Sequence, residues 1–327
     1  MNAMRSFEDR RAQVRITAAV LIVLSVLSAL IAMCLGAALR GNGAGTGHAI
    51  VVGVRLPRIL SSYLVGMALS VCGACMQGLF HNPMADPHML GVSSGAAFGV
   101  ALCTLIGGGA LMRFTGLFAF AFSIAAVLIV LTLSHTHGRV TTVSLLLAGI
   151  AVSSLLTALT SGLMVIDREN LENVYMWTMG SFTSSSWDKL KIAAPVILMG
   201  VLGIIAFARD LNALLMGESD ARQLGVNVRR VRLILLLLST LVTATAVSIS
   251  GVIGFVGLMV PHAMRMFCGP DHRGLLPLSA LAGGLYLLIM DTLARTVLMP
   301  IEIPIGVLTA MVGGPFFLYL LKRRNDA

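Results

Sequence analysis

Long apolar runs that recur along almost the whole chain constrain this sequence more than any other feature. Ten runs are separated by short polar or glycine-rich segments, and they cover residues 16–39, 59–80, 90–109, 114–133, 140–166, 192–208, 233–249, 251–268, 275–293 and 305–321. A transmembrane helix needs about 20 mostly apolar residues, which is close to the length of most of these runs. Only 11% of the 327 residues are charged, whereas average globular chains carry about 25%. The sequence therefore predicts an all-α polytopic membrane protein, a ten-transmembrane-helix bundle in a single domain over 1–327.

The distribution of Lys and Arg predicts how this bundle is oriented. Ten spans place both ends of the chain on the same side of the membrane. With the N-terminus in the cytoplasm, 15 of the 23 basic residues fall in inside segments and 8 in outside segments, which fits the excess of Lys and Arg in cytoplasmic loops. Both termini are therefore expected to be cytoplasmic, as are an N-terminal arm (1–15), a long loop (209–230) and a tail (322–327). The eight basic residues expected outside are Arg40, Arg55, Arg58, Arg113, Arg168, Lys189, Lys191 and Arg295.

The chain lacks the residue patterns of several common chemistries. A P-loop needs Gly-Lys-Ser/Thr to cradle phosphates, and none of the three lysines follows a glycine. No His is followed by Glu, as the zinc-protease motif requires, and the five cysteines lie in or beside apolar runs, which argues against a disulfide framework. The basic residues form short clusters without interleaved aromatics, unlike a nucleic-acid-binding surface. We expect no catalytic residues, no metal, no cofactor bound by this chain and no nucleic-acid partner.

The long cytoplasmic loop contains a segment with a distinct pattern. Residues 211–225 are expected to form a short amphipathic helix, in which Glu218 and Asp220 precede Arg222 and Gly225 provides a C-cap. Helices that lie on a membrane surface usually carry Lys and Arg on their polar face, and this one is acidic. The segment therefore favours docking to a soluble partner.

Charged residues inside the membrane are a second candidate site, because such residues are costly there. Asp291 and Arg295 lie four residues apart near the outer end of the ninth run, in the order that favours an ion pair within the helix. Pairing within the helix and a surface role for Arg295 remain open alternatives. A secondary transporter would need accessible acids at the membrane midplane, and Asp291 is the only clear intramembrane acid. An intramembrane enzyme would need a nucleophile or metal ligands among the spans, and none is convincing.

Several sequence blocks form a specific pattern when they are taken together. The blocks are Arg-Leu-Pro-Arg at 55–58, Gln-Gly-Leu-Phe-His-Asn-Pro-Met-Ala-Asp-Pro at 77–87, Leu-Gly-Val-Ser-Ser-Gly-Ala at 90–96, Gly-Glu-Ser-Asp-Ala-Arg-Gln-Leu-Gly at 217–225, Gly-Val-Ile-Gly-Phe-Val-Gly-Leu-Met-Val-Pro-His at 251–262, Asp-Thr-Leu-Ala-Arg at 291–295 and Pro-Ile-Gly at 304–306. With these blocks the sequence resembles the FecCD family of ABC-importer permeases, which import iron chelates, haem and cobalamin. The resemblance covers about 16–324, nearly the whole chain.

This resemblance implies a ten-helix permease subunit of a bacterial inner membrane, paired with a second copy of itself around a translocation path through the lipid. It also implies two cytoplasmic ATPase subunits, which bind ATP and Mg, and one periplasmic binding protein. By position, the residues that dock the binding protein would be Arg55, Arg58 and Arg295. Those of the coupling helix that seats on the ATPase would be Leu214, Gly217, Glu218, Ala221, Arg222, Leu224 and Gly225. Those at the inner constriction of the path would be Asn82, Met84, Thr141 and Thr142.

The transported substrate follows from the resemblance only in outline. The run at 78–88 and the turn at 269–273 are most similar to those of haem permeases. We therefore expect an iron chelate, with haem first and a ferric siderophore next, and cobalamin as the alternative. Pairing with itself or with a paralogous subunit remains open.

Overall fold

The structure is a computed structural model that describes residues 2–35, 50–136, 139–140 and 142–325. Apart from one hairpin of two-residue strands, these residues form helices and their connections. Ten helices have 13 residues or more: α1 (Asn2–Cys34), α3 (Leu56–Leu79), α4 (Val92–Gly107), α5 (Thr115–Leu133), α6 (Thr142–Ile166), α8 (Trp187–Ala206), α11 (Val228–Ser250), α12 (Val256–Cys268), α13 (His272–Ala294) and α14 (Ile305–Asn325). The shorter elements are η2 (Val51–Arg55), η3 (Pro87–Leu90), η4 (Gly108–Phe114), β1 (His135–Thr136), β2 (Arg139–Val140), α7 (Leu171–Thr178), α9 (Ala208–Leu215) and α10 (Glu218–Gln223).

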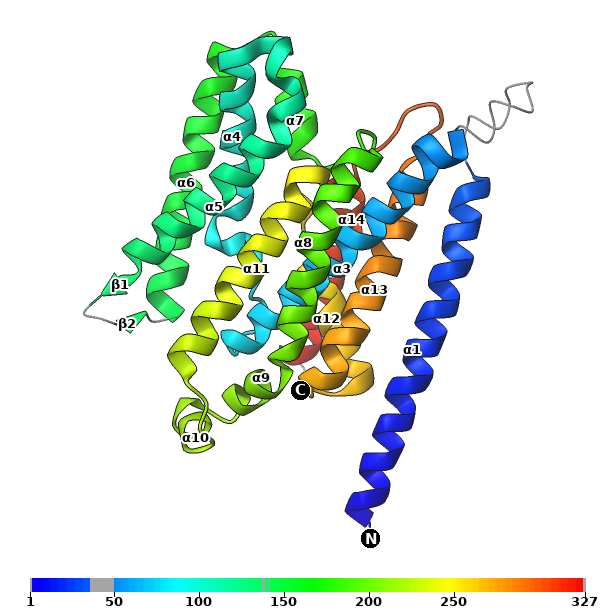
Figure 1. The fold of residues 1–327 in the computed structure, drawn as a ribbon, viewed down its shortest axis with the longest axis vertical. Helices are drawn as coiled ribbons and strands as arrows, with labels where there is room; N and C mark the ends of the chain where they lie inside the picture. The colour runs from blue at the N-terminus through cyan, green and yellow to red at the C-terminus, as the bar shows by residue number, and fades with distance from the viewer. Residues whose placement is uncertain (1, 36–49, 137–138, 141, 326–327) are drawn as a thin grey trace.

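The helices form one bundle with α3 at its centre. This helix packs against α13, α11, α12 and α8, and most of its residues are buried. The helices α4, α5 and α6 pack against one another on one side, while α1 stands at the opposite edge beside α13 (Figure 1). Figure 1 also places the start of α1 and the end of α14 toward the same end of the bundle as α9 and α10.

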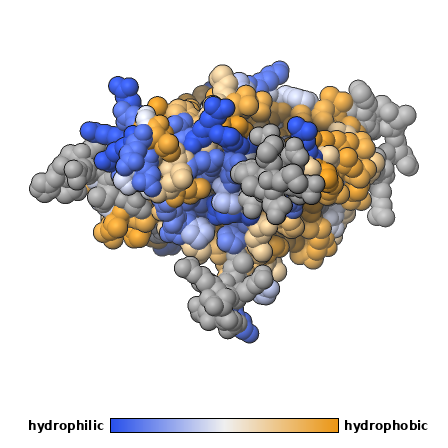
Figure 2. Space-filling view, turned by 90° about the horizontal axis from the view of Figure 1, so that it is seen from below, coloured by the Kyte–Doolittle hydropathy of each residue, from blue (hydrophilic) through white to orange (hydrophobic). Residues whose placement is uncertain are grey.

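The outer helices carry the apolar surface that a lipid environment requires. Seven helices among the described residues are long and apolar enough to cross a membrane, and large exposed hydrophobic side chains line α1, α5, α6 and α8. In the view from the end that carries α9 and α10, hydrophilic residues gather on the end face and hydrophobic ones flank it (Figure 2). The chain is therefore a multi-pass helical membrane protein, as the composition predicts.

Two of the ten predicted runs form shorter helices than expected. The run at 251–268 was expected to be helical throughout, but α12 begins at Val256 and residues 251–254 are unwound. The 13 residues of α12 rise about 20 Å, which is less than the apolar thickness of a bilayer, about 30 Å. The helix α4 is also short, with 16 residues. Hydropathy alone does not reveal these ends because the unwound segment is itself apolar.

Glycines allow the central helices to approach closely. A Cβ added to Gly73 of α3 would overlap the backbone of Gly257 in α12, so the backbones of the two helices touch with no side chain between them. Gly95 and Gly99 of α4 lie against α5, where an added Cβ would be 2.5 Å from the carbonyl oxygens of Phe122 and Phe118. Such small-residue faces are the main way in which helices associate closely in lipid.

Candidate functional site: a coupling surface and a buried arginine cluster

The segment predicted as one amphipathic helix is two short helices joined at a glycine. The helix α9 ends at Leu215, α10 begins at Glu218, and Gly217 between them has φ of +115°. L-amino acids with side chains rarely adopt this conformation, so the expectation of a continuous helix over 211–225 is wrong at this point. The C-cap residue of α10 is Leu224, and Gly225 follows it with φ of +84° and donates its N–H to the carbonyl of Arg222. A glycine just after the cap is a common helix end, so Gly225 helps to end the helix from one residue beyond the C-cap, and not as the C-cap itself as predicted.

Glu218 forms one ion pair within α10 and a second one with the start of α11. Its carboxylate accepts hydrogen bonds from Arg222, at 3.2 Å, and from Arg232, at 2.6 Å. The bond from Arg232 is the main reason that the pKa of Glu218 lies below its ordinary value, so this side chain is ionised at neutral pH. Ala221, on the same short helix, is fully buried. The pair with Arg232 and the burial of Ala221 hold α10 against the bundle and leave its other face to solvent.

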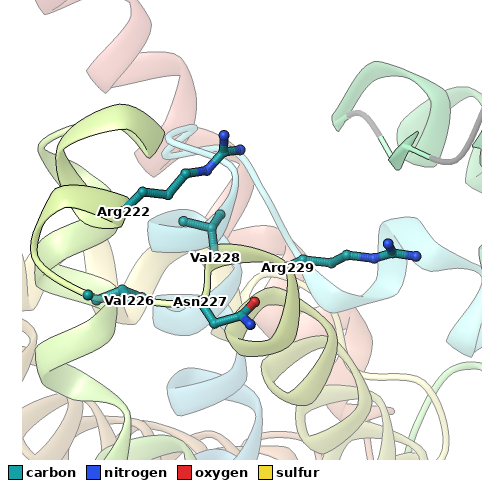
Figure 3. Close-up of a pocket in the computed structure, with 6 residues that line it drawn as sticks. Arg222, Val226, Asn227, Val228 and Arg229 are labelled. Carbon is teal, nitrogen blue, oxygen red and sulfur yellow. The ribbon is translucent and has the colours of Figure 1, made fainter.

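The exposed tip of this region combines apolar and charged side chains. Met216 is 68% exposed and Leu224 is 65% exposed, next to the acidic and basic residues of α10. A hollow of about 390 Å³ lies beside them, lined by Arg222, Gly225, Val226, Asn227, Val228 and Arg229. In Figure 3, Arg222 extends from α10 and Arg229 from the start of α11, with Val228 between them. Exposed apolar residues within a charged rim are typical of a surface that docks another protein.

The helix α9 connects this tip to the bundle through hydrogen bonds to the turn after α3 and to the start of α13. Its Leu214 carbonyl lies 2.7 Å from Nε2 of His81, in the turn after α3. Its Asn212 side chain donates to Asp271 at 2.6 Å and accepts from the backbone N–H of His272 at 2.9 Å. These bonds link α9 to the turn after α3 and to the start of α13. None of these residues was among the predicted site residues, although His81 directly precedes Asn82 of the predicted path.

The predicted path residues lie in that same turn. The Asn82 side chain accepts a hydrogen bond from the N–H of Met84 at 2.9 Å, which holds the turn, and Met84 is exposed. Thr142 is the first residue of α6, and Thr141 lies outside the described residues. The structure brings Asn82 and Met84 together in the turn that contacts α9.

The predicted docking arginines gather at the opposite end of the bundle, where Arg58 binds two carboxylates. Its Nε and Nη2 donate to Asp291 of α13 at 2.9–3.1 Å. Its Nη1 and Nη2 donate to Glu302, between α13 and α14, at 3.1 Å each. The Arg58 side chain is only 10% exposed and that of Asp291 is fully buried. Glu302 was not among the predicted site residues, and it is found only through the fold because 244 residues separate it from Arg58.

Arg55 and Arg295 contact the C-terminal end of α1. Arg295 donates through Nη1 to the carbonyl of Leu35 at 3.1 Å and through Nη2 to that of Ala32 at 2.6 Å. Arg55 donates through Nη1 to the Met33 carbonyl. The last carbonyls of a helix lack partners within the helix, and basic side chains stabilise them. Arg295 thus does more than pair with Asp291, from which its Nε is 3.9 Å away.

Because the arginines hold the structure together, substituting them would change stability as well as any docking. An acidic residue at position 58 would add a third carboxylate beside Asp291 and Glu302 inside the protein, which is strongly destabilising. The buried acid is likewise committed to Arg58, which disfavours a role for Asp291 in ion-coupled transport. Among the described residues, no group of three His, Cys, Asp or Glu side chains is placed to hold a metal ion.

The chain is thus a helical membrane bundle with an exposed apolar and charged tip at one end and a buried charge cluster at the other. The FecCD transport family matches residues 15–323, and the chain belongs to this family.

Three relatives illustrate the similarity. The chain is 46% identical over 285 residues to the cobalamin import system permease protein BtuC of Halobacterium salinarum, covering 86% of this chain and 75% of that protein. It is also 46% identical over 285 residues to the hemin transport system permease protein HmuU of Yersinia pestis, covering 85% and 84%. A solved metal-chelate type ABC transporter in an inward-facing conformation aligns with a TM-score of 0.86 and 34% identity over 94% of this chain and 98% of that one.

Proposed function

We propose that this chain is the permease subunit of an ABC importer that moves an iron chelate, preferably haem, from the periplasm to the cytoplasm. The observation that carries the proposal is the hydrogen-bonded connection between the exposed tip at α9 and α10 and the turn that holds Asn82 and Met84. ATP and Mg bind a separate ATPase subunit, and this chain holds no cofactor of its own. Its partners are two such ATPases, a periplasmic binding protein and a second copy of itself.

The mechanism follows from the rigid contacts of α9. Closure of the ATPase dimer moves α9 and α10, which seat on it through Met216 and Leu224. The His81 and Asn212 contacts then carry the movement to α3 and α13. Because these helices pack along their length, they tilt together and open one side of the path. A chelate that arrives already complexed needs a wide passage and no tight site within the membrane.

The proposed topology has ten transmembrane helices and both termini in the cytoplasm, and it gives a labelling prediction. Cys34, at the end of α1, is an exposed free thiol, and Cys268 is half-buried at the end of α12. A membrane-impermeant maleimide should label Cys34 in intact spheroplasts but reach Cys268 only after permeabilisation. Cys34→Ser and Cys268→Ser variants assign each signal. Labelling of Cys268 in intact spheroplasts, with Cys34 protected, would contradict the orientation.

The coupling role predicts the effect of Glu218→Arg. The substitution breaks the pairs with Arg222 and Arg232 and places three like charges together on the surface that we propose to seat on the ATPase, where they disfavour docking. Substrate uptake should fall by about tenfold or more, while the chain still reaches the membrane. Asp188→Arg, at an exposed acid of the opposite end, is the control and should transport normally. Full uptake by Glu218→Arg in an assembled transporter would refute the assignment.

The choice of haem rests on the similarity of residues 78–88 and 269–273 to haem permeases. The hemin permease of Yersinia pestis supports it, and its alignment covers more of that relative than the cobalamin alignment does. Cobalamin remains the second candidate because the halobacterial cobalamin permease is equally identical to this chain.

A further inference from the structure

The two carboxylates that bind Arg58 are held very differently. Asp291 lies within α13 with its side chain fully buried, whereas the Glu302 side chain is 40% exposed. Glu302 lies outside any helix, in the segment between α13 and α14. Its second oxygen also accepts a hydrogen bond from the Thr183 hydroxyl at 2.9 Å. Asp291 is therefore a fixed inner partner of Arg58, and Glu302 is an outer partner that can leave without unfolding a helix.

Glu302 also borders open space. A cavity of about 550 Å³ at this end of the bundle is lined by Glu302 and by polar residues that include Thr183, Ser184, Lys189 and Ser250. The Lys189 ammonium donates to the Ser184 hydroxyl at 2.9 Å. A carboxylate that leaves Arg58 would thus find hydroxyl donors and a cation in the same cavity. Burial works against ionisation of Glu302, but the bonds and charge of Arg58 outweigh it and lower its pKa, so it is an anion at neutral pH.

We propose that Glu302 occupies the place on Arg58 that a carboxylate of the docked periplasmic binding protein takes, so that docking proceeds by exchange of one carboxylate for the other. The inference rests on the proposed importer function and adds a residue that sets the affinity and specificity of the docking surface. The partner is a protein with acidic side chains. In the absence of the binding protein, Glu302 neutralises the outer face of Arg58. When the binding protein docks, its carboxylate takes the place of Glu302, so Arg58 still binds two carboxylates, one of which is Asp291.

The exchange has a structural consequence because Glu302 lies just before α14. The first two N–H groups of α14, from Ile305 and Gly306, donate to the carbonyls of Gly180 and Met179 at 3.0 and 2.9 Å, just after α7. Thr183, the other partner of Glu302, follows in the same connection. Release of Glu302 therefore removes its hydrogen bond to Thr183 in this connection, while the backbone bonds of Ile305 and Gly306 keep α14 joined to it.

The test is the affinity of the purified permease–ATPase complex in lipid nanodiscs for its haem-loaded periplasmic binding protein. Glu302→Gln keeps the shape of the side chain but replaces a charge-assisted pair with a weaker neutral one, so the partner carboxylate no longer has to displace an anion. The dissociation constant should fall by about tenfold, equivalent to about 1.4 kcal/mol. Asp188→Asn removes an exposed acid elsewhere on this end and is the control for a general charge effect.

A second variant separates the effect of the hydrogen bond that holds Glu302 from the effect of its charge. Thr183→Val leaves Glu302 ionised but removes the hydroxyl that holds it, so it should tighten binding in the same direction by a smaller factor. An unchanged or weaker affinity for Glu302→Gln, or a gain matched by Asp188→Asn, would overturn the exchange. If the wild-type complex binds no binding protein at all, the proposed importer function itself fails, and the two failures are thus distinguishable.

Discussion

An Asp291→Asn chain should unfold far more readily than the wild type. Asp291 is fully buried and binds Arg58 through three hydrogen bonds, with Arg295 nearby. The amide leaves these guanidinium groups without their inner counter-charge, and breaking a buried pair in this way costs about 3–5 kcal/mol. Denaturant titration of the purified protein in detergent micelles measures the loss in the free energy of unfolding.

The exposed Asp188 at the same end of the bundle offers a matched control. Asp188→Asn should change the free energy of unfolding by no more than about 0.5 kcal/mol, as is usual for surface substitutions. If the two variants prove equally stable, the charge cluster does not hold α3 to α13.

A Gly73→Val substitution should prevent α3 and α12 from meeting. Even the first carbon of a side chain at Gly73 would overlap the backbone of Gly257, and backbone cannot move aside as a flexible side chain can. We expect a loss of about 3 kcal/mol in stability or more, seen as aggregated protein on size-exclusion chromatography after detergent extraction.

Gly162, in α6, provides the comparison because nothing lies within 4 Å of a Cβ added there. Gly162→Val should extract and elute like the wild type. A monodisperse, fully active Gly73→Val protein would mean that α12 does not pack against α3 as described.

Features that depend on residues close in the chain could be predicted from the sequence. The apolar runs locate the long helices. Gly225 was predicted to end the helix because helix ends have local signals. The break at Gly217 was missed because amphipathic spacing continues across it, and only the backbone angle reveals two helices.

Features that depend on distant residues could not be predicted. The partners of Arg58 lie 233 and 244 residues away, and no spacing rule connects them. For Arg295 the sequence left open an intrahelical pair or a surface role, but its guanidinium mainly contacts the carbonyls of Ala32 and Leu35 at the end of α1. The roles of Arg55, Arg58 and Arg295 in docking remain a prediction, and their burial makes Glu302 the better residue to test.

If this chain carries an iron chelate across the membrane by ATP-driven transport, cells without it lose that uptake. The most direct measurement is uptake of radiolabelled haem, a ferric siderophore and cobalamin by cells that lack the gene, with and without the wild-type chain restored. We predict that haem uptake is lost, that the wild-type chain restores it and that the Glu218→Arg chain does not. Unchanged haem and siderophore uptake together with loss of cobalamin uptake would contradict the assignment of an iron chelate. Haem uptake that persists when cellular ATP is depleted would contradict ATP-driven transport.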